Sequence, residues 1–540
     1  MRFNRSHVLL FLILLLTLVI RIPGIDQALF GDEQDLVVGV YAHEAFGFNP
    51  IVSHAPLASW IFQAIGMLCQ SIWCFRLFMA FLGTVTILLI FMIGKKVYNT
   101  RAGLAASLIA SLSFYHVLAS NQLADDGALA LMFYSLFFYV YIHYRENPSN
   151  RLAVSLGIIF GLALITKETS IFMLAIVAIY ESLELVRSSA SITTWFSRIK
   201  MYVPVASIGA LFVAGFLTLA YIANTTLLGK ILQRSGGNIG VGVSFLGISM
   251  FLFWATPFLI GLFLIATLDR DRRNDLFIIW FAIIFVFYSF FVKQGDYSRY
   301  YMNLIIPMSL VAGNFLGRVK FRKIHLMFGS AIAAAYYILL TLLSRETFQY
   351  VPRDMNLYIS KIQSLDFSFM FSYVSSSGPY VLLPFNTIVL TFVACASLFL
   401  LYIVVPKKVK TCLLVSFIAI AFTFNIFLLN QYLFALDTPD VSQTVTDSIE
   451  YYQGLESDAI VYSNNDALLF MLDANYLRKD GFYYVGNYGE SLPKVTKGNI
   501  LLLDYPTIPR DSELWIWAES CDLRERFSSE GQAFVYIYSC

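Results

Sequence analysis

Residues 8–34 read VLLFLILLLTLVIRIPGIDQALFGDEQ. An apolar run of about the length that spans a bilayer ends in a Pro-Gly turn and is followed closely by two adjacent carboxylates, Asp32 and Glu33. No small-residue cleavage site follows the apolar run, so we expect a retained membrane helix instead of a cleaved signal. Two adjacent acids just beyond the end of a membrane helix, in a chain with few charges, need an explanation.

The composition is that of an integral membrane protein. Of the 540 residues, 58% are hydrophobic and 13% are charged, and the mean hydropathy is +0.69. Soluble domains carry about a quarter charged residues. The net charge of +2 is uninformative by itself. From the high hydrophobic fraction and the low charged fraction, we expect the lipid bilayer as a partner, and no nucleic acid.

Thirteen segments are apolar over about the length that crosses a bilayer. They are residues 7–23, 75–97, 102–120, 126–144, 152–166, 169–187, 201–224, 244–267, 276–293, 300–317, 325–343, 384–405 and 411–431. The predicted fold is therefore mostly α, a polytopic membrane protein with about thirteen transmembrane helices.

The placement of charges predicts the orientation of these helices. If the N-terminus is cytoplasmic, the loops on its side hold twenty Lys and Arg residues, and the opposite short loops and helix ends hold ten. This asymmetry agrees with the positive-inside rule. An odd number of spans then places the C-terminal region of this multi-pass cell-membrane protein outside the cytoplasm.

The long loops are expected on the outer side. The first outer loop, 24–74, contains two amphipathic stretches near 32–46 and 56–70, which we interpret as helices on the membrane surface. The second, 344–383, contains a flexible turn at 375–379.

The composition changes after about residue 432. This predicts a transmembrane domain over 1–431 and a small extracytoplasmic α/β domain over 432–540, since about 100 residues suffice for one domain. The strands expected in the second domain are 459–462, 481–485, 499–503, 514–517 and 533–538. Its sequence has no glycine-rich phosphate motif, zinc-ligand spacing or nucleophile elbow.

Four of the six cysteines lie in or near apolar segments: Cys69, Cys74, Cys395 and Cys412. There a buried thiol acts as a small hydrophobic group. Cys521 and Cys540 lie in the polar tail and could pair if that tail is outside the cytoplasm. The sequence alone leaves this pairing open.

Asp32 and Glu33 are the first candidate site residues. As ordinary loop acids they would be solvated, or would favour a helix N-terminus. A functional role is favoured because their loop joins the first two spans, because His54 follows at short range, and because other charges gather at outer helix ends. One outer pocket that mixes carboxylates with cations would suit a phosphate beside a general base. His54 alone is more often a packed interfacial histidine than a catalyst.

Lys167, Arg299 and Asp126 are the other candidates. As structural residues, Lys167 would extend from a helix end to the membrane interface and Asp126 would cap a helix. Arg299 would likewise lie at the interface, beside tyrosines of an aromatic belt. As functional residues, Lys167 and Arg299 would grip a lipid-linked phosphate, the lysine as a point charge and the arginine by planar bidentate contact.

Together these motifs resemble the C-type (GT-C) membrane glycosyltransferases, and more narrowly the branch of the protein O-mannosyltransferases and the lipid A aminoarabinose transferases. The runs that carry the resemblance are Phe30-Gly31-Asp32-Glu33, His54-Ala55-Pro56-Leu57, Asp126-Gly127-Ala128-Leu129 and Thr166-Lys167-Glu168. Arg299-Tyr300, with Pro307 in the same span, resembles an Arg-Tyr pair followed by proline. Ala55 departs from a family proline, and Glu168 departs from a family glycine.

The resemblance implies inverting transfer of a mannose-like hexose or a related sugar from a polyprenyl-phosphate donor. The acceptor would be a hydroxyl of a glycan, lipid or protein on the extracytoplasmic side. Asp32 would be the catalytic base. The substrate-binding residues would be Glu33, His54, Asp126, Lys167, Arg299 and Tyr300. No cofactor is required, because side-chain cations suffice for a lipid monophosphate; a divalent metal is left open.

The alternative is a polytopic lipid or sugar transporter or flippase without transferase activity. Transporters usually place their binding groups near the bilayer midplane, on broken helices often related by internal repeats. Here the ionisable residues lie at outer helix ends, and no repeat is found. A third hypothesis is a polysaccharide- or carrier-binding protein that has lost activity, against which the presence of Asp32, Lys167 and Arg299 argues.

Overall fold

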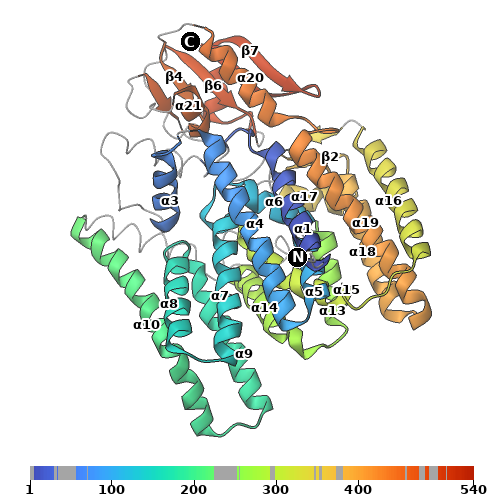
Figure 1. Ribbon diagram of the computed structural model, residues 1–540. Helices are drawn as coiled ribbons and strands as arrows, with labels where there is room; N and C mark the ends of the chain where they lie inside the picture. Colours follow the sequence, from blue (N-terminus) through green and yellow to red (C-terminus); the bar gives the residue numbers. More distant parts are fainter. Residues whose placement is uncertain are drawn as a thin grey trace.

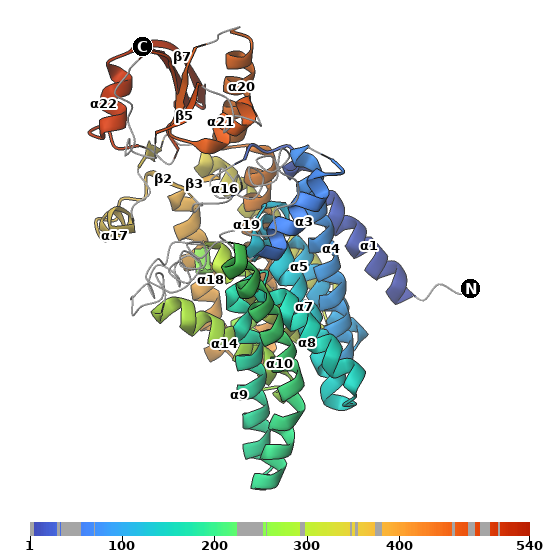
Figure 2. The same ribbon diagram turned by 90° about the vertical axis from the view of Figure 1, so that its left-hand side faces the viewer.

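The computed structural model describes most of the chain. The described residues are 5–29, 33, 56–69, 71–223, 252–254, 256–291, 298–345, 348–351, 355–372, 381–455, 459–473, 481–485, 497–505 and 508–540. A bundle of long helices forms the larger part, and a small sheet with short helices stands over one end of it (Figures 1 and 2). The predicted mostly α fold with a C-terminal strand-containing region is confirmed.

Nine helical spans of the described ranges are long and apolar enough to cross a membrane. Their main helices are α1 (Arg5–Arg21), α4 (Ile72–Val97), α7 (Ala130–Glu146), α9 (Phe172–Arg187), α10 (Ile192–Ala223), α14 (Asp275–Phe290), α16 (Lys323–Ser344), α18 (Phe385–Val404) and α19 (Lys407–Phe434). With an adjoining short helix, the spans of α1, α7, α9 and α14 are Arg5–Gly24, Asp125–Glu146, Glu168–Arg187 and Arg272–Phe290. Three shorter apolar helices lie within other predicted spans: α8 (Asn150–Leu164), α13 (Pro257–Thr267) and α15 (Ile305–Leu316). The multi-pass architecture is therefore confirmed, whereas the count of thirteen stays a prediction.

The predicted span 102–120 is broken. Helices α5 (Thr100–Leu112) and α6 (Phe114–Asn121) meet at an angle of 65°. At the break, the side chain of Asn425 donates to the carbonyl of Leu112 (2.6 Å) and accepts from the N–H of Phe114 (2.8 Å). Because backbone polar groups in a bilayer must be satisfied within the protein, this amide allows the chain to bend there.

The outer loops are partly described. Helix α3 (Pro56–Gly66) matches the predicted amphipathic stretch at 56–70, whereas the stretch at 32–46 lies outside the described residues except for Glu33. The loop predicted over 344–383 contains more structure than expected. Its elements are β1 (Gln349–Tyr350), α17 (Met355–Gln363), β2 (Phe369–Ser372) and β3 (Leu382–Pro384). The strands form one sheet, and the turn predicted at 375–379 lies outside the described residues.

The C-terminal sheet has the strand order β5-β4-β6-β8-β7. Its strands are β4 (Val461–Ser463), β5 (Phe482–Tyr484), β6 (Asn499–Leu503), β7 (Asp522–Ser529) and β8 (Gln532–Ser539). The first three are parallel, and β8 pairs antiparallel with β6 and β7. The helices are α20 (Val441–Gln453), α21 (Asp466–Leu472) and α22 (Glu513–Glu519). The domain division near residue 432 stays a prediction.

One strand prediction is wrong, and one strand of the sheet was not predicted. The strand predicted at 514–517 is wrong, because these residues lie in α22. There the Ser512 side chain accepts from the N–H of Trp515 (3.3 Å) and starts a helix. Strand β7 was not predicted, because it is a mostly exposed edge strand without a run of apolar residues.

Two disulfides are present among the described cysteines. Cys521 pairs with Cys540, which the sequence left open. Cys69 pairs with Cys74, so the prediction that both act as buried hydrophobic thiols is wrong. The pair spans the short turn between α3 and α4, where the two thiols meet because only four residues separate them.

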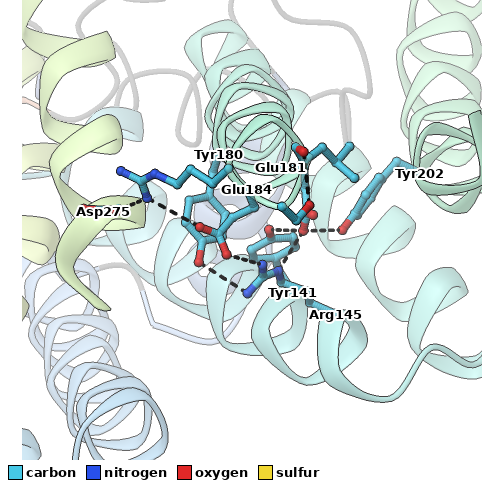
Figure 3. Close-up of polar contacts among 10 residues, drawn as sticks. Tyr141, Arg145, Tyr180, Glu181, Glu184, Tyr202 and Asp275 are labelled. Atoms are coloured by element: carbon cyan, nitrogen blue, oxygen red, sulfur yellow. Dashed lines mark hydrogen bonds and ion pairs between the residues drawn. The ribbon is translucent and has the colours of Figure 1, made fainter. Parts of the chain in front are cut away.

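At the far end of the bundle from the C-terminal sheet, a polar network joins α7, α9 and α10 (Figure 3). Glu181 accepts hydrogen bonds from Tyr141 (2.7 Å), Arg145 (3.0 Å) and Tyr202 (3.0 Å). Arg145 also pairs with Glu184 (3.1 Å). Arg145, one of the basic residues predicted to lie on the cytoplasmic side, thus fastens the end of α7 to α9.

Asn425→Leu should lower the free energy of unfolding by about 2 kcal/mol, because a carbonyl and an N–H at the break would lose their partner. The midpoint of thermal unfolding in detergent micelles measures this change. Ser416→Ala is the control, since the Ser416 hydroxyl bonds only within α19. Equal midpoints for the two variants would contradict the role of Asn425.

Candidate active site

Glu33, one of the two predicted acids, is fixed by a buried ion pair. Its carboxylate lies 3.1 Å and 3.2 Å from the guanidinium nitrogens of Arg76, near the start of α4. It also accepts from the N–H of Leu123 (3.0 Å), just after α6. The side chains of Glu33 and Arg76 are 2% and 3% exposed. A buried pair is tolerated only when further hydrogen bonds satisfy it. Here they satisfy both terminal nitrogens of Arg76, whereas its Nε has no partner among the described residues.

Arg76 supplies most of those further bonds. It donates to the carbonyl of Asn121 (2.6 Å) and to the carbonyls of Gln27 and Ala28 (3.2 Å each). One guanidinium thus holds the start of the first outer loop, Glu33 and the end of α6 together. Asp32, the predicted base, lies outside the described residues.

Lys167 lies between two adjacent carboxylates. Its ammonium is 3.2 Å from Asp125 and 3.5 Å from Asp126. The three side chains are 13%, 14% and 3% exposed, in that order. The predicted residues Lys167 and Asp126 are therefore brought together, and Asp125 joins them.

The backbone at Asp125 explains how neighbouring carboxylates reach one ammonium. Residues i and i+1 of an α-helix do not face the same side. Here η2 (Asp125–Leu129) is a π-helical turn, and Gly127 departs from helical geometry with ψ −131°. A Cβ at Gly127 would lie 2.8 Å from the carbonyl of Ala119, so this close approach requires glycine.

The two charge clusters flank one short segment, 121–126. Glu33 and Arg76 bind its backbone at Leu123 and Asn121, and Lys167 binds its side chain at Asp125. Consecutive Cα atoms are 3.8 Å apart. The segments that carry both clusters therefore lie within about 8 Å of each other at 123–125.

The other two predicted motifs approach the same place. The N–H of Leu57, at the start of α3, donates to the carbonyl of Ile165 (2.9 Å), two residues before Lys167. His54 lies outside the described residues. Helix η5 (Ser298–Leu304), which contains Arg299 and Tyr300, packs against η2 and α6. The side chains of these two residues lie outside the described part of the chain.

The described part of the chain has no candidate metal site. Among the described residues, no group of three or more His, Cys, Asp or Glu side chains is arranged to bind a metal ion.

A second buried arginine has a side-chain partner within the bundle. The fully buried Arg21 donates to Nδ1 of His116 (2.6 Å).

Sequence reasoning missed Arg76 and Arg21, which it counted only as loop charges. A signal was present for Arg76, since an arginine four residues into an apolar span needs a partner inside the protein.

Comparison with known proteins finds similarity to membrane glycosyltransferases in part of the sequence and in the fold. Residues 53–219 match the family model described as dolichyl-phosphate-mannose-protein mannosyltransferase. This range contains His54, Asp126 and Lys167 but neither Asp32 nor Arg299. No curated protein sequence matches the chain.

The crystal structures of ArnT from Cupriavidus metallidurans are similar over nearly the whole chain. For the structure bound to undecaprenyl phosphate, the TM-score is 0.61 at 15% identity, covering 98% of this chain and 97% of ArnT. For the apo structure, the TM-score is 0.62 at 15% identity, covering 99% and 98%. The chain therefore has the C-type membrane glycosyltransferase fold of the ArnT and mannosyltransferase branch, as the motifs predicted.

Arg76→Met should lower the free energy of unfolding by about 3–5 kcal/mol, because it leaves Glu33 buried without its partner. The double variant Arg76→Met, Glu33→Gln should recover part of that loss. Thermal unfolding in detergent micelles gives both values, with Arg151→Met, an exposed arginine, as the control. Additive effects of the two substitutions would show that the pair is not coupled.

Proposed function

We propose that this chain, whose fold is that of the C-type membrane glycosyltransferases, is an integral-membrane inverting glycosyltransferase. It transfers a mannose-like hexose or a related sugar from a polyprenyl-phosphate donor to an acceptor hydroxyl of a glycan, lipid or protein. The observation that carries this proposal is the meeting of the Glu33–Arg76 and Lys167–Asp125 pairs on residues 121–126.

The reaction makes and breaks one bond at the anomeric carbon of the donor sugar. The acceptor oxygen attacks this carbon as its bond to the phosphate oxygen breaks, and the polyprenyl phosphate leaves with the electron pair. The acceptor proton passes to Asp32. Attack opposite to the leaving group inverts the configuration. A positioned general base contributes about 10²–10⁴-fold to such a step.

Glu33 takes the orienting role, because its carboxylate is buried against Arg76 and Leu123 and is not open to substrate. Asp32 is joined to Glu33 by one peptide bond. A base attached to a fixed neighbour loses less orientational freedom when it reacts, and such positioning lowers the barrier.

Lys167 and Arg299 hold the leaving phosphate. The cluster of Lys167, Asp125 and Asp126 carries one positive and two negative charges, so it cannot bind an anion well by itself. Arg299 on the adjacent η5 supplies the second positive charge. Asp126, His54 and Tyr300 complete the polar wall that meets the sugar.

Several observations support the donor class and the side of the membrane. The matching family is named for dolichyl-phosphate-mannose, and the similar ArnT structure holds undecaprenyl phosphate. Both are polyprenyl phosphates. The disulfides Cys69–Cys74 and Cys521–Cys540 support an extracytoplasmic location of α3 and the C-terminal region, since disulfides persist in oxidising compartments. The comparisons give no support to a transporter.

Asp32→Asn should reduce sugar transfer at least about 10²-fold while donor binding is kept, because only the proton acceptor is lost. The assay uses purified protein in proteoliposomes with radiolabelled polyprenyl-phosphate hexoses and a panel of glycan, lipid and peptide acceptors. Asp26→Asn, an exposed acid in the same loop, is the control. Unchanged turnover in Asp32→Asn would remove Asp32 as the base, and no transfer by the native chain would contradict the proposal.

Lys167→Gln and Asp125→Asn should change donor affinity in opposite directions. Loss of the ammonium should weaken donor binding about ten-fold or more, whereas loss of one competing carboxylate should strengthen it several-fold, since charges about 4 Å apart near a protein surface interact by about 1–4 kcal/mol. Equilibrium binding of labelled polyprenyl phosphate measures both. Weaker binding in both variants would indicate a structural role for the Lys167 cluster.

A further inference from the structure

A cavity lies between the helix bundle and the C-terminal sheet, apart from the residues proposed to act in sugar transfer. Its volume is about 420 Å³, within the range of small-molecule sites. Figure 2 shows β2 and β3 between the sheet and the bundle, and the cavity is formed there. The lining residues used below are Arg345, Phe348, Tyr350, Asp437 and Glu530.

The walls of this cavity come from distant parts of the chain and are held together. The Tyr350 ring packs edge-on against Phe534 of β8, with centroids 6.0 Å apart. The N–H of Asp440 donates to the Ser529 hydroxyl (3.0 Å), next to Glu530. These contacts fix β8 against β1, and the end of β7 against the start of α20.

Glu530 has an uncommon backbone conformation. It begins the two-residue turn between β7 and β8, with φ 50°, followed by Gly531 with φ 77°. Turns of this kind favour Asn, Asp or Gly at both positions, and a positive φ is uncommon for glutamate. Ala435, just before the cavity wall at Asp437, also has a positive φ of 43°, as the left-handed cap that ends α19.

Two of the three charged side chains of the cavity have no hydrogen-bond or ion-pair partner within the described part of the chain. Within the described part of the chain, neither the Arg345 nor the Glu530 side chain makes a hydrogen bond or ion pair. Asp437 keeps one contact, since one of its carboxylate oxygens accepts from Gln431 (3.3 Å). Burial and the Glu530 carboxylate raise the pKa of Tyr350 to about 12, so its hydroxyl stays a donor at neutral pH.

These groups suit a neutral polyhydroxylated ligand. Two carboxylates accept hydrogen bonds, a guanidinium and a phenol donate them, and the Phe348 and Tyr350 rings offer apolar faces. An anion would meet two carboxylates and one guanidinium, and an acyl chain would meet a polar lining. We propose that this cavity binds the neutral saccharide part of the acceptor, an assignment that rests on the proposed transferase function.

The position of the cavity agrees with an acceptor subsite. Gln27, whose carbonyl accepts from Arg76, donates through its side chain to the carbonyl of Tyr432 (2.6 Å) in α19. Ala28 donates to the Ser442 hydroxyl (2.8 Å) in α20. Residues 27 and 28 therefore join the segment that carries Asp437 to the ion pair that holds Glu33.

Binding of purified protein to an array of neutral manno-, gluco- and galacto-configured oligosaccharides tests this proposal. Glu530→Gly removes the carboxylate and relieves the positive φ, so the variant should fold at least as well as the native chain. Its saccharide affinity should fall at least about ten-fold, since hydrogen bonds to charged groups are the strong ones. Its affinity for polyprenyl phosphate should be unchanged. Glu525→Gln, an exposed acid on β7, is the control.

The outcomes separate this inference from the proposed function. Saccharide binding that depends on Glu530, in a chain that transfers no sugar, would support the cavity and contradict the transferase. Sugar transfer with the same acceptor KM in the native chain and Glu530→Gly would overturn the cavity alone. An array on which the native chain retains no saccharide better than Glu530→Gly would likewise overturn it.

Discussion

The buried ion pair between Glu33 and Arg76 is the interaction on which the candidate site depends. Neither buried charge would be stable alone, and each is stabilised by the other and by backbone groups. The pair joins the first outer loop to α4 and to the end of α6. Because it uses peptide carbonyls and an N–H, it fixes the path of the chain as well as the side chains. This gives Glu33 a defined place between the start of α4 and the end of α6.

Residues 121–126 link the two charge clusters, because both clusters contact this segment. The break at Ser113, satisfied by Asn425, turns α6 away from α5 before this segment begins. The irregular turn at Gly127 then directs two successive carboxylates to Lys167. Departures from regular helix thus create the site, and polar side chains inside the bundle make them tolerable. The opposite end, around Glu181, uses similar chemistry only to fasten helices.

The sequence predicted the features that follow from hydrophobic length and charge placement. These are the long helices, the strand-rich tail, and the approach of the segments that carry Glu33, Asp126 and Lys167. It could not predict pairings that depend on the fold. Arg76 was counted only as one of the basic residues at loops and helix ends. Glu33 was predicted to bind substrate, because its pairing with Arg76 cannot be inferred from the sequence. Residues 514–517 read as a strand because a short apolar run fits either structure until the Ser512 cap is seen.

The central claim is that ionisable groups from separate helices converge on one lipid phosphate at the outer membrane edge. An experimental structure of the chain with bound polyprenyl phosphate tests it most directly. The account predicts the phosphate within hydrogen-bond distance of both Lys167 and Arg299, with the Asp32 carboxylate facing the place where the sugar would be attached. A phosphate bound elsewhere, with Lys167 still held only by Asp125 and Asp126, would contradict the account.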